Sequence, residues 1–422
     1  MKYQHSNKRF ELTILVLFLA VCTGFSQNNL EYYLKAAREN NPTIKENLSL
    51  KEKAAIQEKM IKAEYQGPKV YASGEANYSP LIPNKDDPKA VGYDVAITDG
   101  GLITANLNVL QPIFNNPIRE TLSQQAQASG EAGVVKAALT LHQLEKEVTD
   151  QYIIAYQSLS QIEFTKNLTD QLLKQKEIIE ALAKNGIYKS SDILLLDIEI
   201  LNQTAQLNNL QSVYNQNIYA LNSQCGITGQ SNTELTLPDI ELREDIRQSK
   251  FLDKFRSDSL QEAFNLQVSN LKYKPQFNIY GNTGLKAIEF SGIQRKFGAS
   301  VGVTMFIPIY DGHQRDYNQQ QANINLQDID NYKQNFIIQK SNRQQAILSS
   351  LDLIDKKIEI INSQLRNYEK LIGLYKNELQ AGNLEIINYM NTIRSYTSLQ
   401  NDLSVNRTNK LMIINENNYY NW

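Results

Sequence analysis

Cysteine and histidine are scarce in this chain of 422 residues, which has two cysteines and three histidines. Cys22 falls in an N-terminal leader, so Cys225 is the one thiol left in the mature chain and no intrachain disulfide can form. His5, His142 and His313 are far apart, and no metal-ligand spacing, glycine-rich phosphate loop or Ser/His/Asp set stands out. We therefore predict that the protein is not an enzyme and holds no metal and no cofactor.

The chain also lacks a charge excess, frequent helix breakers and long apolar runs. Lys and Arg total 43 against 45 for Asp and Glu, a net charge of −2, so nothing marks it for nucleic acid. Its 19 glycines and 10 prolines are few, which favours long helices. Beyond the leader no apolar run approaches the ~18 residues of a transmembrane helix.

The N-terminus has the pattern of an export signal. Basic residues precede an apolar run at Leu12–Val21, and small residues follow it. We predict a signal peptide over residues 1–26, cleaved after Ser26; the alternative is a lipoprotein signal ending at Cys22. An exported chain without a transmembrane helix is either soluble outside the cytoplasm or an outer-membrane β-barrel.

One long segment of the chain occurs twice. The sequences QPIFNNPIRE and IPIYDGHQRD each open a long helical pattern that ends at a glycine. Pro112 lies 74 residues before Gly186, and Pro308 lies 74 residues before Gly382. This equal spacing indicates a tandem duplication. We predict a first structural repeat at 27–226, a linker or equatorial segment at 227–250 and a second repeat at 251–422.

Each half combines two strands with two long helices. Apolar and polar residues alternate at about 69–78, 102–110, 275–283 and 298–306, and each strand pair flanks a loop, as in outer-membrane hairpins. Long helices are predicted at about 117–184, 191–222, 313–380 and 385–420. A stripe from Ile347 to Leu379 keeps the coiled-coil period. A short helix from about Glu241 is predicted to lead into one ending near Tyr273.

Four strands cannot close a barrel, and an open sheet edge is not tolerated in a membrane. Closure would need further copies of the chain: two copies give eight strands and three give twelve. Eight-stranded barrels are largely filled by side chains, so a conduit favours three copies. The predicted fold is mainly α with transmembrane β: a duplicated β-hairpin and helical hairpin, trimerising into a 12-stranded outer-membrane β-barrel continued by a periplasmic coiled-coil tunnel.

The chain resembles the TolC-type outer-membrane efflux proteins in four features. These are NPTIKE at 41–46, QPIFNN, IPIYDG and the paired glycine turns, in the same order over nearly the whole mature chain. The resemblance implies a homotrimer in outer-membrane lipid of a Gram-negative bacterium. It also implies an exit duct for a tripartite efflux or type I secretion system. The partners would be a periplasmic adaptor (membrane fusion) protein and an inner-membrane pump of the resistance-nodulation-division, ABC or major-facilitator type.

The resemblance also suggests site residues. The adaptor would contact the hairpin tips, at Asn185, Gly186, Ile187, Ala381, Gly382 and Asn383, although these glycines could equally serve only as helix C-caps. Acidic residues that narrow the family's periplasmic entrance correspond to Asp192, Asn388 and Asn391. Only Asp192 keeps its charge, and it could instead stabilise a helix start. The family's latch positions fall at Leu379 and Leu384, so a latch is either absent or made differently.

Aromatic residues near the strand ends could form interfacial girdles in a membrane. They are Tyr71, Tyr78, Phe114, Phe277, Tyr280, Phe306 and Tyr310. For Phe114 and Tyr310, ordinary aromatic packing where the barrel meets the helices is an equally good explanation. Two other kinds of protein remain open from the residues alone. A coiled-coil structural fibre would explain the heptads, and a periplasmic adaptor would explain helical hairpins. Neither explains four alternating strands placed symmetrically in both halves.

Overall fold

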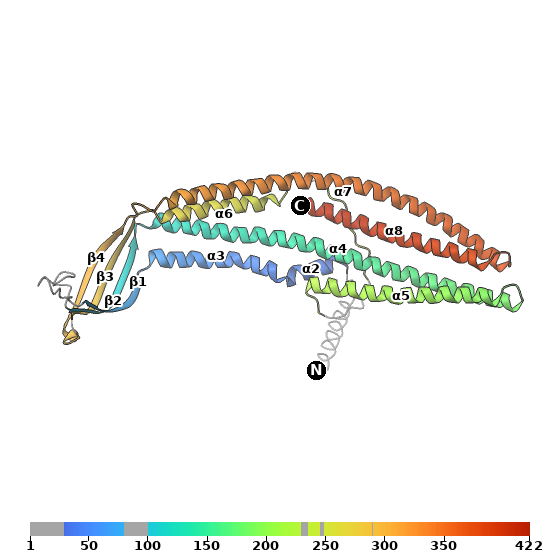
Figure 1. Ribbon diagram of the computed structural model, residues 1–422, viewed down its shortest axis with the longest axis horizontal. Coiled ribbons are helices and arrows are strands. Elements are labelled where there is room, and N and C mark those ends of the chain that lie inside the picture. Colours follow the sequence, from blue (N-terminus) through green and yellow to red (C-terminus); the bar gives the residue numbers. More distant parts are fainter. Residues whose placement is uncertain (1–28, 80–99, 229–234, 245–248, 289) are drawn as a thin grey trace, which may run out of the picture. The chain divides into compact units, whose positions relative to one another are not determined.

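The computed structural model describes residues 29–79, 100–228, 235–244, 249–288 and 290–422 (Figure 1). The predicted signal peptide at 1–26 lies outside these residues. Among the helices that the structure describes, none is both long and apolar enough to cross a membrane.

Two compact units make up the described chain. One unit draws on residues 29–44, 138–250 and 336–422, and the other on 45–137 and 251–335. Each unit therefore contains segments from both halves of the sequence, so the units are not the two repeats. The repeat boundaries stay a prediction.

The order helix, strand, strand, long helix, helix occurs in both halves. The first half contains α2 (Leu30–Asn40), α3 (Pro42–Gln66), β1 (Lys69–Ser79), β2 (Gly100–Ile113), α4 (Asn116–Lys184) and α5 (Ser190–Cys225). The second half contains α6 (Leu252–Leu271), β3 (Gln276–Ala287), the 3-10 turn η1 (Ile293–Arg295), β4 (Phe297–Phe306), α7 (Gln314–Gln380) and α8 (Ile386–Tyr420).

The strands form one antiparallel sheet in the order β1-β2-β3-β4 (Figure 1). In the first hairpin, the residue after Pro68 pairs with the residue two before Pro112. In the second, the residue after Pro275 pairs with the residue two before Pro308. The two hairpins thus share one register relative to their prolines, and their difference in length falls in the loops, where it costs little. The described residues supply no partner for the outer edges of β1 and β4.

Small residues bring α3 close to α4. Gly130 and Gly133 are buried one turn apart on α4. A Cβ on Gly130 would lie 2.8 Å from the Cβ of Ala54. A Cβ on Gly133 would lie 2.6 Å from the Cβ of Leu50 and 3.0 Å from the carbonyl oxygen of Asn47. Larger side chains at these two positions would therefore push the helices apart.

The predicted coiled-coil stripe of α7 is turned inward, as expected. Its buried members are Ile347, Leu351, Ile361, Leu365, Ile372 and Leu379, and the others are half-buried. Ile372 and Leu379 join Leu172, Ile179 and Ile386 in one apolar cluster. This cluster draws on α4, α5, α7 and α8, so it packs the two helical hairpins together beside their tips.

The helix predicted from about Glu241 is wrong for the described residues, because 241–244 form no helix. Asn418 on α8 donates to the carbonyl oxygen of Glu241 (2.7 Å) and accepts the backbone N–H of Arg243 (2.8 Å). Asn417 donates to the carbonyl oxygen of Arg243 (3.0 Å). Side-chain amides of α8 thus take the backbone groups that a helix would pair internally.

Candidate functional site

The two helical hairpins turn in the same way at their tips. Gly186 has a φ of 76°, and the N–H groups of Gly186 and Ile187 bond back to the carbonyls of Ala183 (2.9 Å) and Leu182 (3.2 Å). At the second tip Gly382 has a φ of 75°, and the N–H groups of Gly382 and Asn383 bond back to the carbonyls of Leu379 (3.1 Å) and Glu378 (2.9 Å). Both are Schellman turns, which need a left-handed residue after the helix. The helix-ending role of both glycines is confirmed, and contact with an adaptor stays a prediction.

The two tips contact each other, and the six predicted tip residues are exposed. A Cβ on Gly382 would lie 2.6 Å from the Cγ2 of Ile187. The hydroxyl of Tyr188 donates toward the carbonyl oxygens of Leu379 (2.8 Å) and Leu384 (3.1 Å). This tie between the tips reaches the backbone of Leu379 and Leu384, and the fate of the latch expected at these positions stays a prediction. Sequence reasoning missed Tyr188, because its bonds go to backbone atoms and leave no motif.

The predicted entrance residues lie near the starts of two helices, Asp192 and Asn388 on the first turns and Asn391 on the second turn of α8. Asp192 accepts the backbone N–H of Lys189 at 2.9 Å, so its carboxylate stabilises the start of α5. Asn388 and Asn391 are exposed, three residues apart on α8. Among the described residues, no hydrogen bond or ion pair joins Asp192 to either asparagine. The helix-start role of Asp192 is confirmed, and the gating roles stay predictions.

A buried carboxylate joins α5 to α8 next to these positions. The side chain of Glu199 is only 4% exposed and accepts bonds from Arg394 (3.0 Å) and Gln203 (2.9 Å). Arg394 lies three residues after Asn391, and its side chain is 50% exposed. Removing the arginine would leave an uncompensated buried charge, which is strongly unfavourable.

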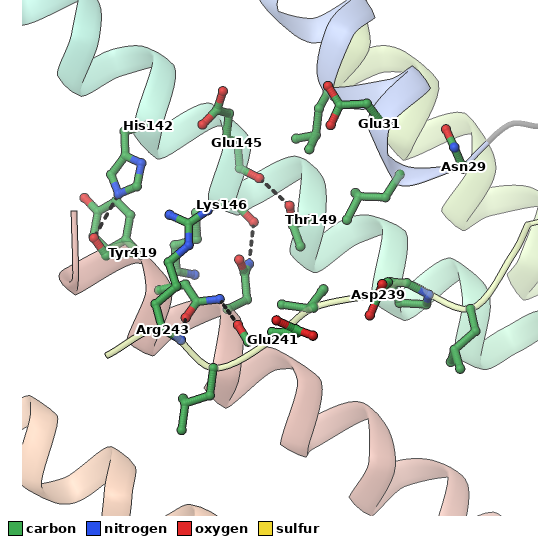
Figure 2. Close-up of a pocket in the computed structure, with 18 of the residues that line it drawn as sticks. Asn29, Glu31, His142, Glu145, Lys146, Thr149, Asp239, Glu241, Arg243 and Tyr419 are labelled. Atoms are coloured by element: carbon green, nitrogen blue, oxygen red, sulfur yellow. Dashed lines mark hydrogen bonds between the residues drawn. The ribbon is translucent and has the colours of Figure 1, made fainter. Parts of the chain in front are cut away.

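A polar pocket of about 850 Å³ lies between α2, α4, α8 and the segment at 236–243 (Figure 2). Arg38 pairs there with Glu145 (2.7 Å) and Glu31 (3.1 Å). Other charges of both signs line it: Lys146, Asp239, Glu241 and Arg243. The sequence did not predict this pocket, because its pattern at 236–243 indicates a linker followed by the start of a helix.

His142, on the pocket wall, is stacked against two aromatic rings. Its ring centroid lies 4.9 Å from that of Tyr419 and 4.2 Å from that of Trp422. Its Nε2 lies 2.8 Å from the carbonyl oxygen of Tyr419 (Figure 2). Burial lowers the pKa of His142 below its usual value, and the bond to Tyr419 opposes this shift. The Nζ of Lys250 lies over the Trp422 ring, 5.1 Å from its centroid.

The sheet has one mainly apolar face and one mainly polar face, because paired residues share a side of the sheet. The exceptions are Gln111 and Thr283 on the apolar face and Leu102 and Leu110 on the polar face. The apolar face carries Val70, Ala72, Ala76, Ile103, Ala105, Leu107, Val109, Phe277, Ile279, Leu285, Ala287, Phe297, Ala299, Val301, Val303 and Met305. The polar face carries Ser73, Glu75, Asn77, Thr104, Asn106, Asn108, Asn278, Asn282, Lys286, Ser300 and Thr304. Many apolar members are exposed, such as Val301 at 80% and Val303 at 66%.

The aromatic residues predicted to form girdles divide between the two faces. Tyr78 and Phe277 share the apolar face, whereas Tyr71, Tyr280 and Phe306 share the polar face. Phe114 and Tyr310, beyond the ends of β2 and β4, are both exposed, and Phe114 packs edge-on against Phe277 at 5.8 Å. The girdle therefore stays a prediction for the residues on the apolar face and at the strand ends only.

No protein-family model matches the chain, and no curated protein matches it either. Solved structures do. The outer membrane protein VceC of Vibrio cholerae aligns with a TM-score of 0.69 at 13% identity, over 93% of this chain and 96% of that chain. The CmeC outer membrane channel of Campylobacter jejuni aligns with a TM-score of 0.70 at 13% identity, over 94% of this chain and 86% of that chain. The open MtrE outer membrane channel of Neisseria gonorrhoeae aligns with a TM-score of 0.68 at 12% identity, over 93% of this chain and 88% of that chain.

These likenesses establish the fold of the chain over almost its full length. The three solved structures are an outer membrane protein and two outer membrane channels. The resemblance drawn from the sequence motifs is thus confirmed at the level of the fold.

Proposed function

We propose that the chain is the outer-membrane exit duct of a tripartite efflux or type I secretion system in a Gram-negative bacterium. In this role it is a passive channel that carries substrates from an inner-membrane pump and a periplasmic adaptor to the exterior. The observation that carries the proposal is the two-faced sheet. An exposed apolar face backed by a face of amides and hydroxyls suits a wall between lipid and water.

The free edges of β1 and β4 support closure by other copies of the chain. Unpaired backbone groups are costly in a bilayer, so both edges need strands beside them. Three copies would give a 12-stranded barrel with a water-filled interior. In such a trimer the helical hairpins would form the periplasmic tunnel.

The tips are the proposed contact with the adaptor, because they are exposed and stand at the turn of each helical hairpin. Asp192, Asn388 and Asn391 would lie at the periplasmic entrance. With two of these three positions uncharged, the entrance would carry less negative charge than an all-acidic one. The tie from Tyr188 to Leu379 and Leu384 would hold the two hairpins of one chain together there.

Two adjacent residues of β4 test the sheet assignment. Val301→Lys places a charge on the proposed lipid face, which costs about 2–4 kcal/mol near the bilayer midplane. Ser300→Lys places the same charge on the proposed water face and serves as the matched control. We expect Val301→Lys to deplete the protein from outer-membrane fractions and Ser300→Lys to leave its amount nearly unchanged.

Equal amounts of both variants in the membrane would contradict the assignment. Extraction of the unmodified protein in buffer without detergent would contradict it more directly, and would favour a coiled-coil fibre or a periplasmic adaptor instead.

A further inference from the structure

Two adjacent rows of residues cross the whole polar face of the sheet without a charge. One row runs Tyr71, Asn108, Asn282, Ser300, and the other Ser73, Asn106, Gly284, Gly298. Every strand contributes one residue to each row. We call these eight residues the amide belt, because its three asparagines supply most of its hydrogen-bonding groups.

Hydrogen bonds within the amide belt hold its side chains in place. The Nδ2 of Asn108 donates to the Oγ of Ser73 at 2.8 Å, joining β2 to β1. The Oγ of Ser300 donates to the Oδ1 of Asn282 at 3.0 Å, joining β4 to β3. Amides and hydroxyls retain donors and acceptors beyond these bonds, so the belt can bind water or polar solutes of either sign.

The charges on this face are few and flank the belt. Glu75 and Lys286 lie on either side of Thr104 in the next row, so a negative and a positive group are close together. On the opposite side of the belt lies Lys69, which pairs with Glu64 at 3.3 Å. In three copies the row of Glu75 and Lys286 would carry three carboxylates and three ammonium groups in alternation, so its described charges balance.

Two glycines face each other in the belt, with crowded surroundings at Gly284 and open space at Gly298. Gly284 faces Gly298, and a Cβ on Gly284 would collide with the carbonyl oxygen of Ala105. A larger residue is thus excluded at Gly284, so no side chain projects from the sheet at this position beside Asn106. Solutes that pass the belt would meet amide and hydroxyl groups and the phenol of Tyr71, with no charged side chain in either row.

We infer that the amide belt makes the strand-lined part of the conduit indifferent to charge, so that the duct passes anionic and neutral polar substrates as readily as cationic ones. This inference rests on the proposed function, which makes the polar face the water-filled wall. Asn108 and Asn282 are the residues that keep the wall neutral. Charge selection would then belong to other parts of the assembly.

The test is the ion selectivity of the full-length protein in a planar lipid bilayer under a KCl gradient. With balanced wall charges, and salt screening within ~10 Å at 0.1 M, we expect a K⁺/Cl⁻ permeability ratio within about twofold of unity. Asn282→Asp, or Asn108→Asp, should raise this ratio because it adds a carboxylate to the belt in every copy. Asn282→Gln keeps the amide and is the control, with the ratio unchanged.

Each outcome decides a separate point. A protein that inserts but never conducts would overturn the proposed function itself. A conducting protein that strongly prefers one ion, and keeps that preference after Asp192→Asn at the proposed entrance, would overturn the inference and leave the duct in place. The inference also fails if Asn282→Asp and Asn108→Asp conduct with the unmodified ratio, because the belt would then not line the ion path.

Discussion

Single side chains connect parts of the chain that are far apart in sequence. Tyr188 of the first tip bonds the carbonyls around the second tip, and Glu199 of α5 holds Arg394 of α8. His142 of α4 is stacked on Trp422, beyond the end of α8. Each contact joins the two halves of the sequence, so the halves are tied by specific groups as well as by apolar packing.

The His142–Trp422 stack can be followed optically, because Trp422 is the only tryptophan of the chain. Protonated imidazole quenches an adjacent indole, so fluorescence should fall as His142 gains a proton. Since burial lowers the pKa of His142, we expect the midpoint below the ordinary value of 6.5. Stability from the neutral imidazole is then complete above pH 6.5 and declines as pH falls toward the lowered pKa.

The control for this titration is His142→Phe, which keeps a ring in the stack and should abolish the transition. A midpoint at or above 6.5 in the unmodified protein would show that burial does not dominate at this histidine.

Tyr188→Phe removes the hydroxyl that ties the tips and keeps the ring. A hydrogen bond of this kind contributes about 0.5–1.5 kcal/mol, which corresponds to a roughly two- to tenfold change in local opening. We expect faster tryptic cleavage after Lys184 and Lys189, both exposed beside the first tip. Tyr219→Phe, at an exposed tyrosine of α5, is the control. Identical cleavage rates for all three proteins would mean that the tie does not restrain the tip.

At the level of elements, glycines serve different purposes at different places. Gly186 and Gly382 end helices in a left-handed conformation, whereas Gly130 and Gly133 lie inside α4, where they admit α3. Gly373 lies inside α7 with no atom near enough to contact an added Cβ. Glycine inside a helix costs about 1 kcal/mol of stability relative to alanine. At Gly130 and Gly133 this cost is offset by the close approach of α3, and at Gly373 no contact within the described chain offsets it.

Gly133→Ala and Gly373→Ala form a matched pair. Alanine at 373 gains helix propensity of about 1 kcal/mol without a clash. Alanine at 133 gains the same propensity but meets Leu50 and the Asn47 carbonyl, and overpacking of this kind costs about 1–3 kcal/mol. We expect Gly373→Ala to raise the apparent Tm and Gly133→Ala to lower it, as followed by helical circular dichroism in detergent. A higher Tm for Gly133→Ala would show that α3 can move away without loss.

For the whole molecule, one described sheet with two free edges cannot be a finished wall. The same chain presents an exposed apolar face on that sheet and two exposed hairpin tips. These features are explained together if lipid covers the apolar face and further copies cover the edges. The proposed homotrimer satisfies both conditions with one kind of chain.

The mass of the detergent-extracted complex tests this assembly. Light scattering corrected for bound detergent should give three copies of the mature chain, because three copies make the 12 strands of an open barrel. A monomer or dimer stable in plain buffer would remove the basis for the shared barrel and, with it, the exit duct.

Much of the fold was predictable from residues close together in sequence. The period of two marked each strand, the 4-and-3 stripe marked the inward face of α7, and the equal proline-to-glycine spacing marked both turns. These features depend on local geometry, which neighbouring residues determine by themselves. The resemblance to outer-membrane channels followed from their order.

The site was less predictable, because its parts depend on which distant segments meet. The bond from Tyr188 to Leu379 could not be predicted, because it depends on the two tips lying side by side. The helix predicted from Glu241 does not form at 241–244, because the amides of Asn417 and Asn418 bond the backbone there. The amide belt appears only when the strand register aligns Asn108 with Asn282. Local sequence patterns were enough to predict the strands and the long helices. The ties, the stack and the belt required the folded chain, since each needs two distant surfaces in contact.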